Sequence, residues 1–299
     1  MYRTFNDEMK WLFGRKVWKL SLDGGFTCPN RDGTLGYGGC TFCAGGGRFV
    51  PDSSLPMDVQ IENAKAILGD KAKNAGFLAY FQSGTNTYAP VSHLRETFFP
   101  VIRREDILGL SIGTRPDCLG NEVLELLGEL AVIKPLWVEL GLQTSKDATA
   151  EKINRGYGRA VFDGAMEKLR AVGVRRVVHI IAGLPGETRE DVFETVRHVA
   201  SFRPEGVKLH LLHVMRGTAL EQSWHRGEFE TLSLDEYTEI AAETVRLLPP
   251  ETTVHRITGD GDKRGLLAPE WSGDKKRVLS TVNRALEGVV QGEKFAQRR

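Results

Sequence analysis

The chain has 299 residues, a length that fits one large single-core domain or two small ones. Its 40 Lys and Arg residues nearly balance its 39 Asp and Glu residues, so the formal net charge of +1 excludes the global positive field of a nucleic-acid coat protein. With 41% hydrophobic and 26% charged residues, the composition excludes a largely disordered chain and a membrane protein.

The sequence shows no targeting or membrane segment. No apolar run approaches the roughly 18 residues that a membrane-spanning helix needs. Residues 1–10 include two acidic residues and lack an apolar core followed by a cleavage site, so we expect no signal peptide. We therefore expect a cytoplasmic protein without membrane contact.

A short β-type run followed by a longer amphipathic stretch repeats along the chain, a pattern typical of βα units on a parallel sheet. The expected strands are residues 17–22, 77–82, 107–112, 136–142, 176–181 and 207–212. The expected helices are residues 59–74, 91–104, 121–130, 148–154, 160–172, 189–202 and 234–247. Six such units without a G-x-G-x-x-G turn predict an α/β fold, a partial (β/α)6 TIM-like barrel, in place of a dinucleotide-binding sheet.

The pattern changes after Leu248. The double proline at 249–250 is followed by an expected edge strand at 253–257 and a charged helix from about 274 to 288. We predict that residues 1–248 form the barrel, with a cysteine loop at 24–47. Residues 249–299 are then a C-terminal extension packed on the barrel.

Polar side chains recur on the strand faces that alternation directs into the barrel. They are Lys19, Ser21, Tyr80, Gln82, Ser111, Glu139, Gln143, Lys208 and His210. A packed structural barrel would place Val, Ile and Leu there. Burying a polar group costs several kcal/mol unless it is paired or binds something, so the set predicts a polar ligand site. For any one of these residues taken alone, hydrogen bonds to neighbouring side chains are a better explanation than a ligand.

Three cysteines follow the first strand in a glycine-rich loop. Cys28, Cys40 and Cys43 form a C-x11-C-x2-C array. Glycines let a backbone fold tightly around an inorganic group and donate N–H bonds to its sulfurs. Three thiolates suit a [4Fe–4S] cluster with one iron left open, because an ordinary electron-transfer cluster takes four.

A structural zinc site is the alternative interpretation. A structural zinc ion is held by four protein ligands with no open position, and the ligands usually come in two close pairs. Cys118 is the candidate for the fourth ligand. Only Cys40 and Cys43 form a close pair, so we favour the cluster. Free cysteines are most often buried small hydrophobes, and we favour that role for Cys118 over a redox or catalytic one.

These residues resemble a radical S-adenosylmethionine (SAM) enzyme, in which a cysteine loop follows the first strand of a partial barrel and an aromatic residue, here Phe42, precedes the last cysteine. The expanded cysteine spacing resembles the YhcC/YtqA subgroup, which is related to the radical SAM domain of the elongator catalytic subunit. The motifs that carry this resemblance are residues 24–34, 80–82, 85–90, 114–118, 139–144, 154–156 and 183–188.

The resemblance implies a [4Fe–4S] cluster held by Cys28, Cys40 and Cys43, with SAM on its open iron and a reducing electron donor such as flavodoxin or ferredoxin. The residues that it implies for SAM binding are Phe42, Gln82, Gln143, Arg155, His179, Gly183, Leu184, Pro185 and Gly186. The guanidinium of an arginine can donate two parallel hydrogen bonds to a carboxylate, and Gln and His side chains can form hydrogen bonds with ribose hydroxyls. At Gln82 the usual acidic residue of the family is missing.

The catalytic candidates that face the substrate are Glu139, Lys208 and His210. Relatives with the elongator-type core act on the wobble uridine of transfer RNA. The resemblance therefore implies tRNA as the substrate and conversion of carboxymethylaminomethyluridine to aminomethyluridine as the reaction. The basic segments 175–176, 275–277 and 294–299 are candidate phosphate contacts, although such runs are more often solvated faces.

Two other interpretations stay open. A radical SAM enzyme on a small metabolite predicts no RNA binding. A non-catalytic iron–sulfur or zinc protein predicts no SAM cleavage on reduction. The polar lumen and the open iron argue against the non-catalytic interpretation, whereas only the resemblance favours tRNA over a small metabolite.

Overall fold

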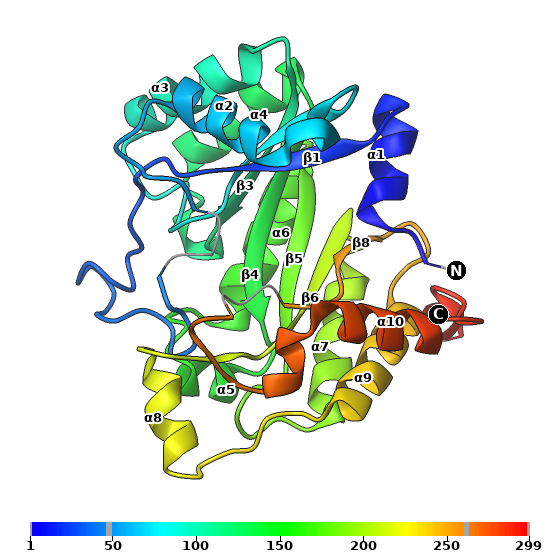
Figure 1. Ribbon diagram of the computed structural model, residues 1–299. Coiled ribbons are helices and arrows are strands. Elements are labelled where there is room, and N and C mark those ends of the chain that lie inside the picture. The colour runs from blue at the N-terminus through cyan, green and yellow to red at the C-terminus, as the bar shows by residue number, and fades with distance from the viewer. Residues whose placement is uncertain (1, 46–49, 260–262, 298–299) are drawn as a thin grey trace.

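A curled parallel sheet forms the core of the computed structural model, which describes residues 2–45, 50–259 and 263–297 (Figure 1). Positions 46 and 47 of the expected cysteine loop and positions 298 and 299 of the last basic segment lie outside these residues. In spatial order the strands are β1 (Val17–Leu22), β2 (Gly76–Phe81), β3 (Ile107–Thr114), β4 (Leu136–Gln143), β5 (Arg175–Ala182), β6 (Gly206–Leu211) and β8 (Thr253–Arg256). Each strand pairs in parallel with its neighbour, which confirms the partial TIM-like barrel.

The six predicted core strands are all confirmed, and their ends lie within two residues of the expected ones. These segments are rich in branched and bulky apolar residues that fill a buried sheet. The predicted edge strand at 253–257 is also confirmed, and as β8 it extends the sheet beyond β6. The division between barrel and extension at residue 248 stays a prediction.

Helices cover the outer face of the sheet and bury their apolar stripes against it (Figure 1). They are α2 (Met57–Leu68), α3 (Val91–Arg103), α4 (Asn121–Ile133), α5 (Asp147–Lys152), α6 (Arg159–Ala171), α7 (Arg189–Ser201) and α9 (Leu234–Leu247). Short 3-10 turns follow α2 (Gly69–Ala72) and β3 (Pro116–Cys118). Because the apolar side chains pack between sheet and helices, the inner face of the sheet is left to polar residues.

A helix that the sequence analysis missed closes the N-terminal end of the barrel. Helix α1 (Phe5–Phe13) begins at Thr4, whose hydroxyl accepts a hydrogen bond from the Asp7 N–H in a capping box. Its buried Met9 packs with Trp137 and with other residues near the strand starts. In Figure 1, α1 lies on the right, and the cysteine loop runs along the left. The lumen is therefore closed by α1 at the strand starts.

Shorter elements complete the chain. They are α8 (Ala219–His225), the antiparallel pair β7 (Val214–Met215) and β9 (Leu266–Ala268), a 3-10 turn (Glu270–Gly273), α10 (Lys275–Ala285) and α11 (Glu293–Ala296). Helix α10 confirms the predicted charged helix, whereas α8 and the small ribbon were not predicted. Among the described residues, no helix is long and apolar enough to cross a bilayer.

Candidate active site

The three predicted cluster cysteines lie on the loop after β1. Backbone bonds shape it: the Arg31 N–H donates to Cys28 O at 2.8 Å, and the Cys43 N–H donates to Cys40 O at 2.9 Å. Burial, together with the neighbouring thiols of Cys43 and Cys28, raises the pKa of the Cys40 thiol to about 11. The three sulfurs are thus close enough to influence one another.

The donor set fits an iron–sulfur cluster. Soft thiolates are the ligands that such clusters take, and a bound metal deprotonates a coordinating thiol outright. Among the described residues, no three His, Cys, Asp or Glu side chains are arranged so that they could hold a metal ion together. Cys43 is exposed, and Cys28 and Cys40 are half-buried. We therefore expect the thiols to turn toward one another when the cluster is inserted.

The cysteine loop is fastened to the segment that follows α5. The buried Asn30 side chain donates to Asn154 O at 2.5 Å, and the Asn154 side chain donates to Gly39 O at 2.9 Å. The Thr41 N–H donates to Ile153 O at 2.9 Å. Two motifs that are more than 100 residues apart in sequence therefore form one clamp around the cysteines.

Replacing Asn30 with alanine is expected to weaken this clamp and lower cluster retention. The substitution leaves the Asn154 carbonyl without this donor, a loss of about 1–3 kcal/mol. It also removes the amide that lies 3.9 Å from Cys40 Sγ. Iron content after anaerobic reconstitution and gel filtration measures the effect. Asn283→Ala on the exposed side of α10 is the control, and equal iron content in both variants would contradict the clamp.

A stacked trio joins the clamp to β3 and β4. The guanidinium carbons of Arg115 and Arg155 lie 4.8 and 4.6 Å from the centre of the Tyr157 ring. The Tyr157 hydroxyl donates to Gly141 O at 2.5 Å, and Arg115 Nη1 donates to Arg155 O at 2.9 Å. Neither Asn30 nor Tyr157 was singled out from the sequence. The sequence signal that could have found them is their position: Asn30 lies inside the cysteine-loop motif, and Tyr157 directly follows the Asn154-Arg155-Gly156 motif.

Arg155, predicted to bind SAM, is fully buried. It donates to Leu142 O, to Thr144 O at 2.7 Å and to Tyr157 O at 3.0 Å. Its Nη2 is buried without a hydrogen-bond partner among the described residues, and Asp147 Oδ1 lies 3.7 Å away. A buried donor of this kind is costly unless a ligand satisfies it, so the site fits a ligand with an anionic group. SAM binding by Arg155 stays a prediction.

The other predicted SAM-binding residues lie around the same end of the barrel. Phe42 packs on the apolar cluster that contains Leu184. Gly183 and Gly186 adopt φ values of 89° and 82°, which side chains with a Cβ rarely reach, in the turn that includes Pro185.

Two polar members of this predicted set point to different partners. The Gln143 side-chain oxygen lies 3.5 Å from the Tyr157 hydroxyl, whereas Gln82 donates to Ser21 Oγ at 2.8 Å. Gln143 therefore lies beside the stacked trio, and Gln82 lies beside β1. Their SAM contacts stay predictions.

One carboxylate, Glu139, organises the polar lumen. Its side chain is fully buried. The donors around it are Lys19 Nζ at 2.6 Å, Ser111 Oγ at 2.6 Å, Tyr80 OH at 3.0 Å, His179 Nε2 at 2.7 Å and Lys208 Nζ. The hydrogen-bond network considered from the sequence is therefore present. His210 stands apart: its Nε2 is buried without a hydrogen-bond partner among the described residues, and its ring centre lies 5.0 Å from that of His179.

Burial and charge set the protonation of the lumen. Burial alone would raise the pKa of Glu139, but Lys19, Lys208 and the His179 hydrogen bond hold that pKa well below its usual range. Burial lowers the pKa of Lys208, and Glu139 opposes this shift. Burial and the charge of Lys208 lower the pKa of His179 to about 4, and burial lowers that of His210 as well. Both histidines are neutral at pH 7.

The stability of the protein is expected to fall as the pH drops from about 6.5 to 4.5. An unfolded histidine takes up its proton near pH 6.5, whereas folded His179 does so near pH 4. The unfolded state therefore binds more protons in this window, and His179 alone accounts for about 2 kcal/mol across it. Urea unfolding at successive pH values measures the slope. His179→Gln should reduce the slope and His225→Gln, an exposed residue, should not; an equal slope in all three proteins would contradict the assignment.

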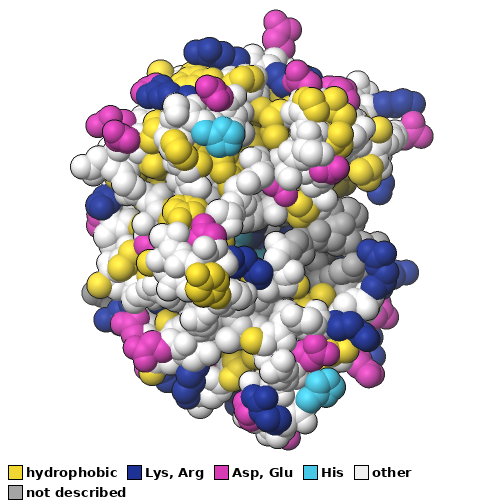
Figure 2. Space-filling model, turned by 90° about the vertical axis from the view of Figure 1, so that its left-hand side faces the viewer, with side chains coloured by type: hydrophobic (Ala, Val, Ile, Leu, Met, Phe, Trp, Pro, Cys, Tyr) yellow, Lys and Arg dark blue, Asp and Glu magenta, His cyan; other side chains and the backbone are white. Residues whose placement is uncertain are grey.

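Figure 2 views the face that carries the cysteine loop and shows it hollowed near the centre, with Lys or Arg side chains at the edge of the hollow. Cys118 lines a separate cavity of about 680 Å³ beside Pro29 and Tyr88. Burial raises the pKa of Cys118 to about 12, so it is a protonated thiol at neutral pH.

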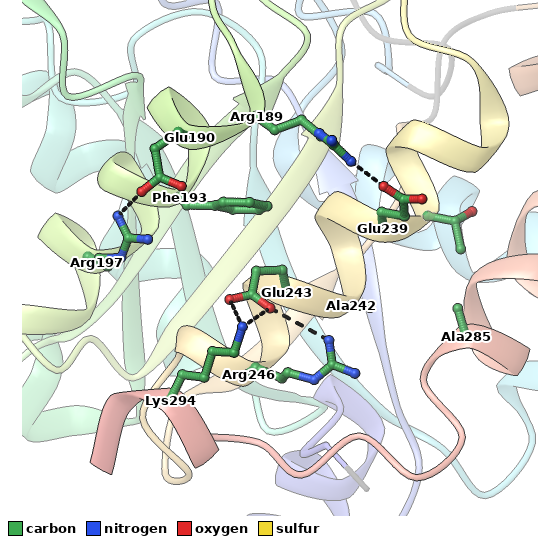
Figure 3. Close-up of a pocket in the computed structure, with 11 residues that line it drawn as sticks. Arg189, Glu190, Phe193, Arg197, Glu239, Ala242, Glu243, Arg246, Ala285 and Lys294 are labelled. Atoms are coloured by element: carbon green, nitrogen blue, oxygen red, sulfur yellow. Dashed lines mark hydrogen bonds and ion pairs between the residues drawn. The ribbon is translucent and has the colours of Figure 1, made fainter. Parts of the chain in front are cut away.

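A second groove lies on the outside of the barrel between α7 and α9 (Figure 3). The ion pairs that line it are Arg189 with Glu239, Arg197 with Glu190 at 2.7 Å, and Lys294 with Glu243 at 2.8 Å. Its charges are satisfied within the groove, and none of its lining residues comes from the lumen or the cysteine loop.

Comparison with known proteins identifies the family of the chain. Residues 28–199 match the Radical SAM superfamily, and residues 204–288 match the Radical_SAM C-terminal domain. The chain is 45% identical to the uncharacterized protein YtqA of Bacillus subtilis, over 99% of this chain and 93% of that protein. It is 38% identical to protein YhcC of Escherichia coli K12, over 98% and 94%.

Two further proteins resemble the chain, one over only part of its length and the other in its fold alone. A tRNA uridine(34) acetyltransferase of Dehalococcoides mccartyi is 31% identical over 51% of this chain and 33% of its own length. The structure of an archaeal Elp3 from Methanocaldococcus infernus superposes with a TM-score of 0.68 at 18% identity, covering 93% of this chain and 64% of that one. The chain therefore belongs to the radical SAM superfamily, whose members use a [4Fe–4S] cluster and SAM.

Proposed function

We propose that this radical SAM enzyme modifies the wobble uridine of tRNA by converting carboxymethylaminomethyluridine to aminomethyluridine. The observation that carries the proposal is the charged lumen, in which Lys19 and Lys208 face a single carboxylate, Glu139. Such a lumen suits a polar, anionic side chain better than an apolar one. The partial similarity to a tRNA uridine(34) acetyltransferase supports the choice of tRNA.

The reaction requires oxidation of the carbon between the amine and the carboxylate. When bound, the cluster and SAM supply a radical that takes one hydrogen atom from this carbon. Loss of a further electron and a proton leaves an imine, and water then cleaves its C–N bond to release aminomethyluridine and glyoxylate. The two-electron oxidation of the substrate is balanced by the reductive cleavage of SAM to methionine and 5′-deoxyadenosine.

The lumen offers an acceptor for the released proton. His210 is neutral at pH 7 because burial lowers its pKa, and its Nε2 has no hydrogen-bond partner among the described residues. We assign it the role of base, with Glu139 and Lys208 holding the substrate. A low-potential donor such as flavodoxin or ferredoxin completes the proposal, and the cytoplasm is the proposed place of action.

Phosphate contacts are assigned to the exposed Lys275, Lys276 and Arg277 at the start of α10. The basic pair Arg175 and Arg176 is not assigned this role, since both side chains form ion pairs with carboxylates of the protein itself. Arg176 is buried against Glu205 at 3.0 Å, and Arg175 lies 3.4 Å from the buried Glu8.

Nucleoside analysis of tRNA from a strain that lacks the gene tests the proposal. We expect carboxymethylaminomethyluridine to accumulate and aminomethyluridine to disappear, and the gene carried on a plasmid should restore the product. A Cys43→Ala variant should not restore it, because it removes one cluster thiolate. Unchanged nucleosides in the deletion strain would contradict the tRNA assignment and direct attention to small metabolites.

A further inference from the structure

Two lysines share one carboxylate in the lumen network. Its strands contribute Lys19 and Lys208, and Glu139 is the carboxylate that both contact. Burial lowers the pKa of Lys208 to about 7, so an anion bound beside it would favour its ammonium form. His179 and His210 are neutral at pH 7 because burial lowers their pKa values.

Among residues 2–45, 50–259 and 263–297, the nearby charges outside this network do not supply a second anion to Lys19 or Lys208. Glu8, on α1, is paired with His255 at 3.1 Å and with Arg175 at 3.4 Å. The positive charge of Arg256 is close enough to lower the pKa values of His210 and Lys208. Positive charge in a buried site is costly, so the lumen favours an incoming anion.

The network also crowds its donors onto one carboxylate. Five side chains donate to Glu139, whereas a carboxylate offers about four lone-pair sites. Lys19 and Lys208 flank Tyr80, with their Nζ atoms 4.7 and 4.5 Å from the centre of its ring. The Lys19 side chain keeps 18% of its surface exposed, so this ammonium group is not sealed off from a ligand.

We propose that Lys19 and Lys208 form a carboxylate-binding subsite inside the barrel, which receives the anionic end of the substrate. The identity of the substrate rests on the proposed function, whereas the subsite rests on the lumen alone. A carboxylate placed beside the Tyr80 ring takes hydrogen bonds from both ammonium groups and balances the surplus charge. The subsite thereby selects substrates that end in a carboxylate over neutral analogues of the same shape.

Calorimetric titration of the cluster-loaded enzyme with two matched probes tests the subsite. N-benzylglycine carries the amine and carboxylate of the proposed substrate, and N-benzylglycinamide replaces the carboxylate with a neutral amide. Titrations are run with and without saturating SAM, since the methionyl carboxylate of SAM is the other possible occupant. We expect the acid to bind at least about tenfold more tightly than the amide with SAM present.

Substitutions at Lys19 test whether the preference for the acid over the amide comes from the lumen. Lys19→Gln should weaken binding of the acid by about tenfold and leave binding of the amide unchanged, and Lys19→Arg should preserve the preference. Lys16→Gln, which removes the same charge from an exposed residue on the preceding loop, should change neither probe. Melting curves confirm that each variant is folded.

Equal binding of acid and amide by the unmodified enzyme, or no binding of either, would overturn the subsite. Displacement of the acid by SAM would also overturn it, because the carboxylate would then belong to the cofactor. A preference for the acid that depends on Lys19, together with unchanged tRNA nucleosides in the deletion strain, supports the subsite and refutes only the tRNA assignment.

Discussion

Replacing Glu139 with glutamine is expected to destabilise the protein by about 3–5 kcal/mol and to abolish turnover. The carboxylate is fully buried and is the anion that Lys19 and Lys208 both contact. Glutamine keeps the shape but leaves two ammonium groups in the lumen without a counter-charge. Its amide also presents donors toward Lys208 and Tyr80, which themselves donate to this position.

Urea unfolding and a deoxyadenosine assay below the unfolding transition measure the two effects of Glu139→Gln separately. Glu129→Gln is the matched control, because Glu129 forms an exposed ion pair with Arg95. Loss of this exposed ion pair should leave the stability almost unchanged. Equal stability of the two variants would show that the lumen charges are not coupled through Glu139.

Replacing Arg155 with methionine is expected to cost about 2–4 kcal/mol of stability and to weaken SAM binding by at least about tenfold. Methionine fills the space but removes the donors to Thr144 O and Tyr157 O. It also removes the buried Nη2, which has no hydrogen-bond partner among the described residues. The stack with Tyr157, which links the site to β4, is lost as well.

Equilibrium binding of SAM to the folded variant separates the two roles of Arg155. Arg170→Met, at an exposed position of α6, removes the same charge and should leave both quantities unchanged. If Arg155→Met lowers stability but binds SAM as tightly as the unmodified protein, the residue serves only to hold the backbone. The predicted contact with the SAM carboxylate would then be wrong.

Most of the sheet could be predicted because its strands are continuous apolar runs separated by amphipathic helices. Strand β4, for example, alternates outward Leu136, Val138, Leu140 and Leu142 with the inward Glu139. The missed helix α1 did carry a local signal, the Thr4 and Asp7 capping box. The pair β7 and β9 had none, since two- and three-residue strands depend on contacts between distant segments.

The site could be predicted in part. Cysteine spacing located the cluster loop, and strand alternation placed Lys19, Glu139 and Lys208 in the lumen together. Alternation does not show which of these side chains contact one another, so the network around Glu139 required the structure. The contact between Asn30 and Asn154 spans 124 residues and follows no periodic pattern, which is why the clamp was not foreseen.

The central claim is tested most directly by an anaerobic assay of the reconstituted enzyme. The cluster is first verified by spectroscopy, and the enzyme is then mixed with reductant, SAM and tRNA from the deletion strain. The account predicts that 5′-deoxyadenosine and aminomethyluridine form in equal amounts, and that neither forms with Cys43→Ala. Deoxyadenosine without any change in the RNA would contradict the proposed substrate, and no deoxyadenosine from an intact cluster would contradict the radical chemistry itself.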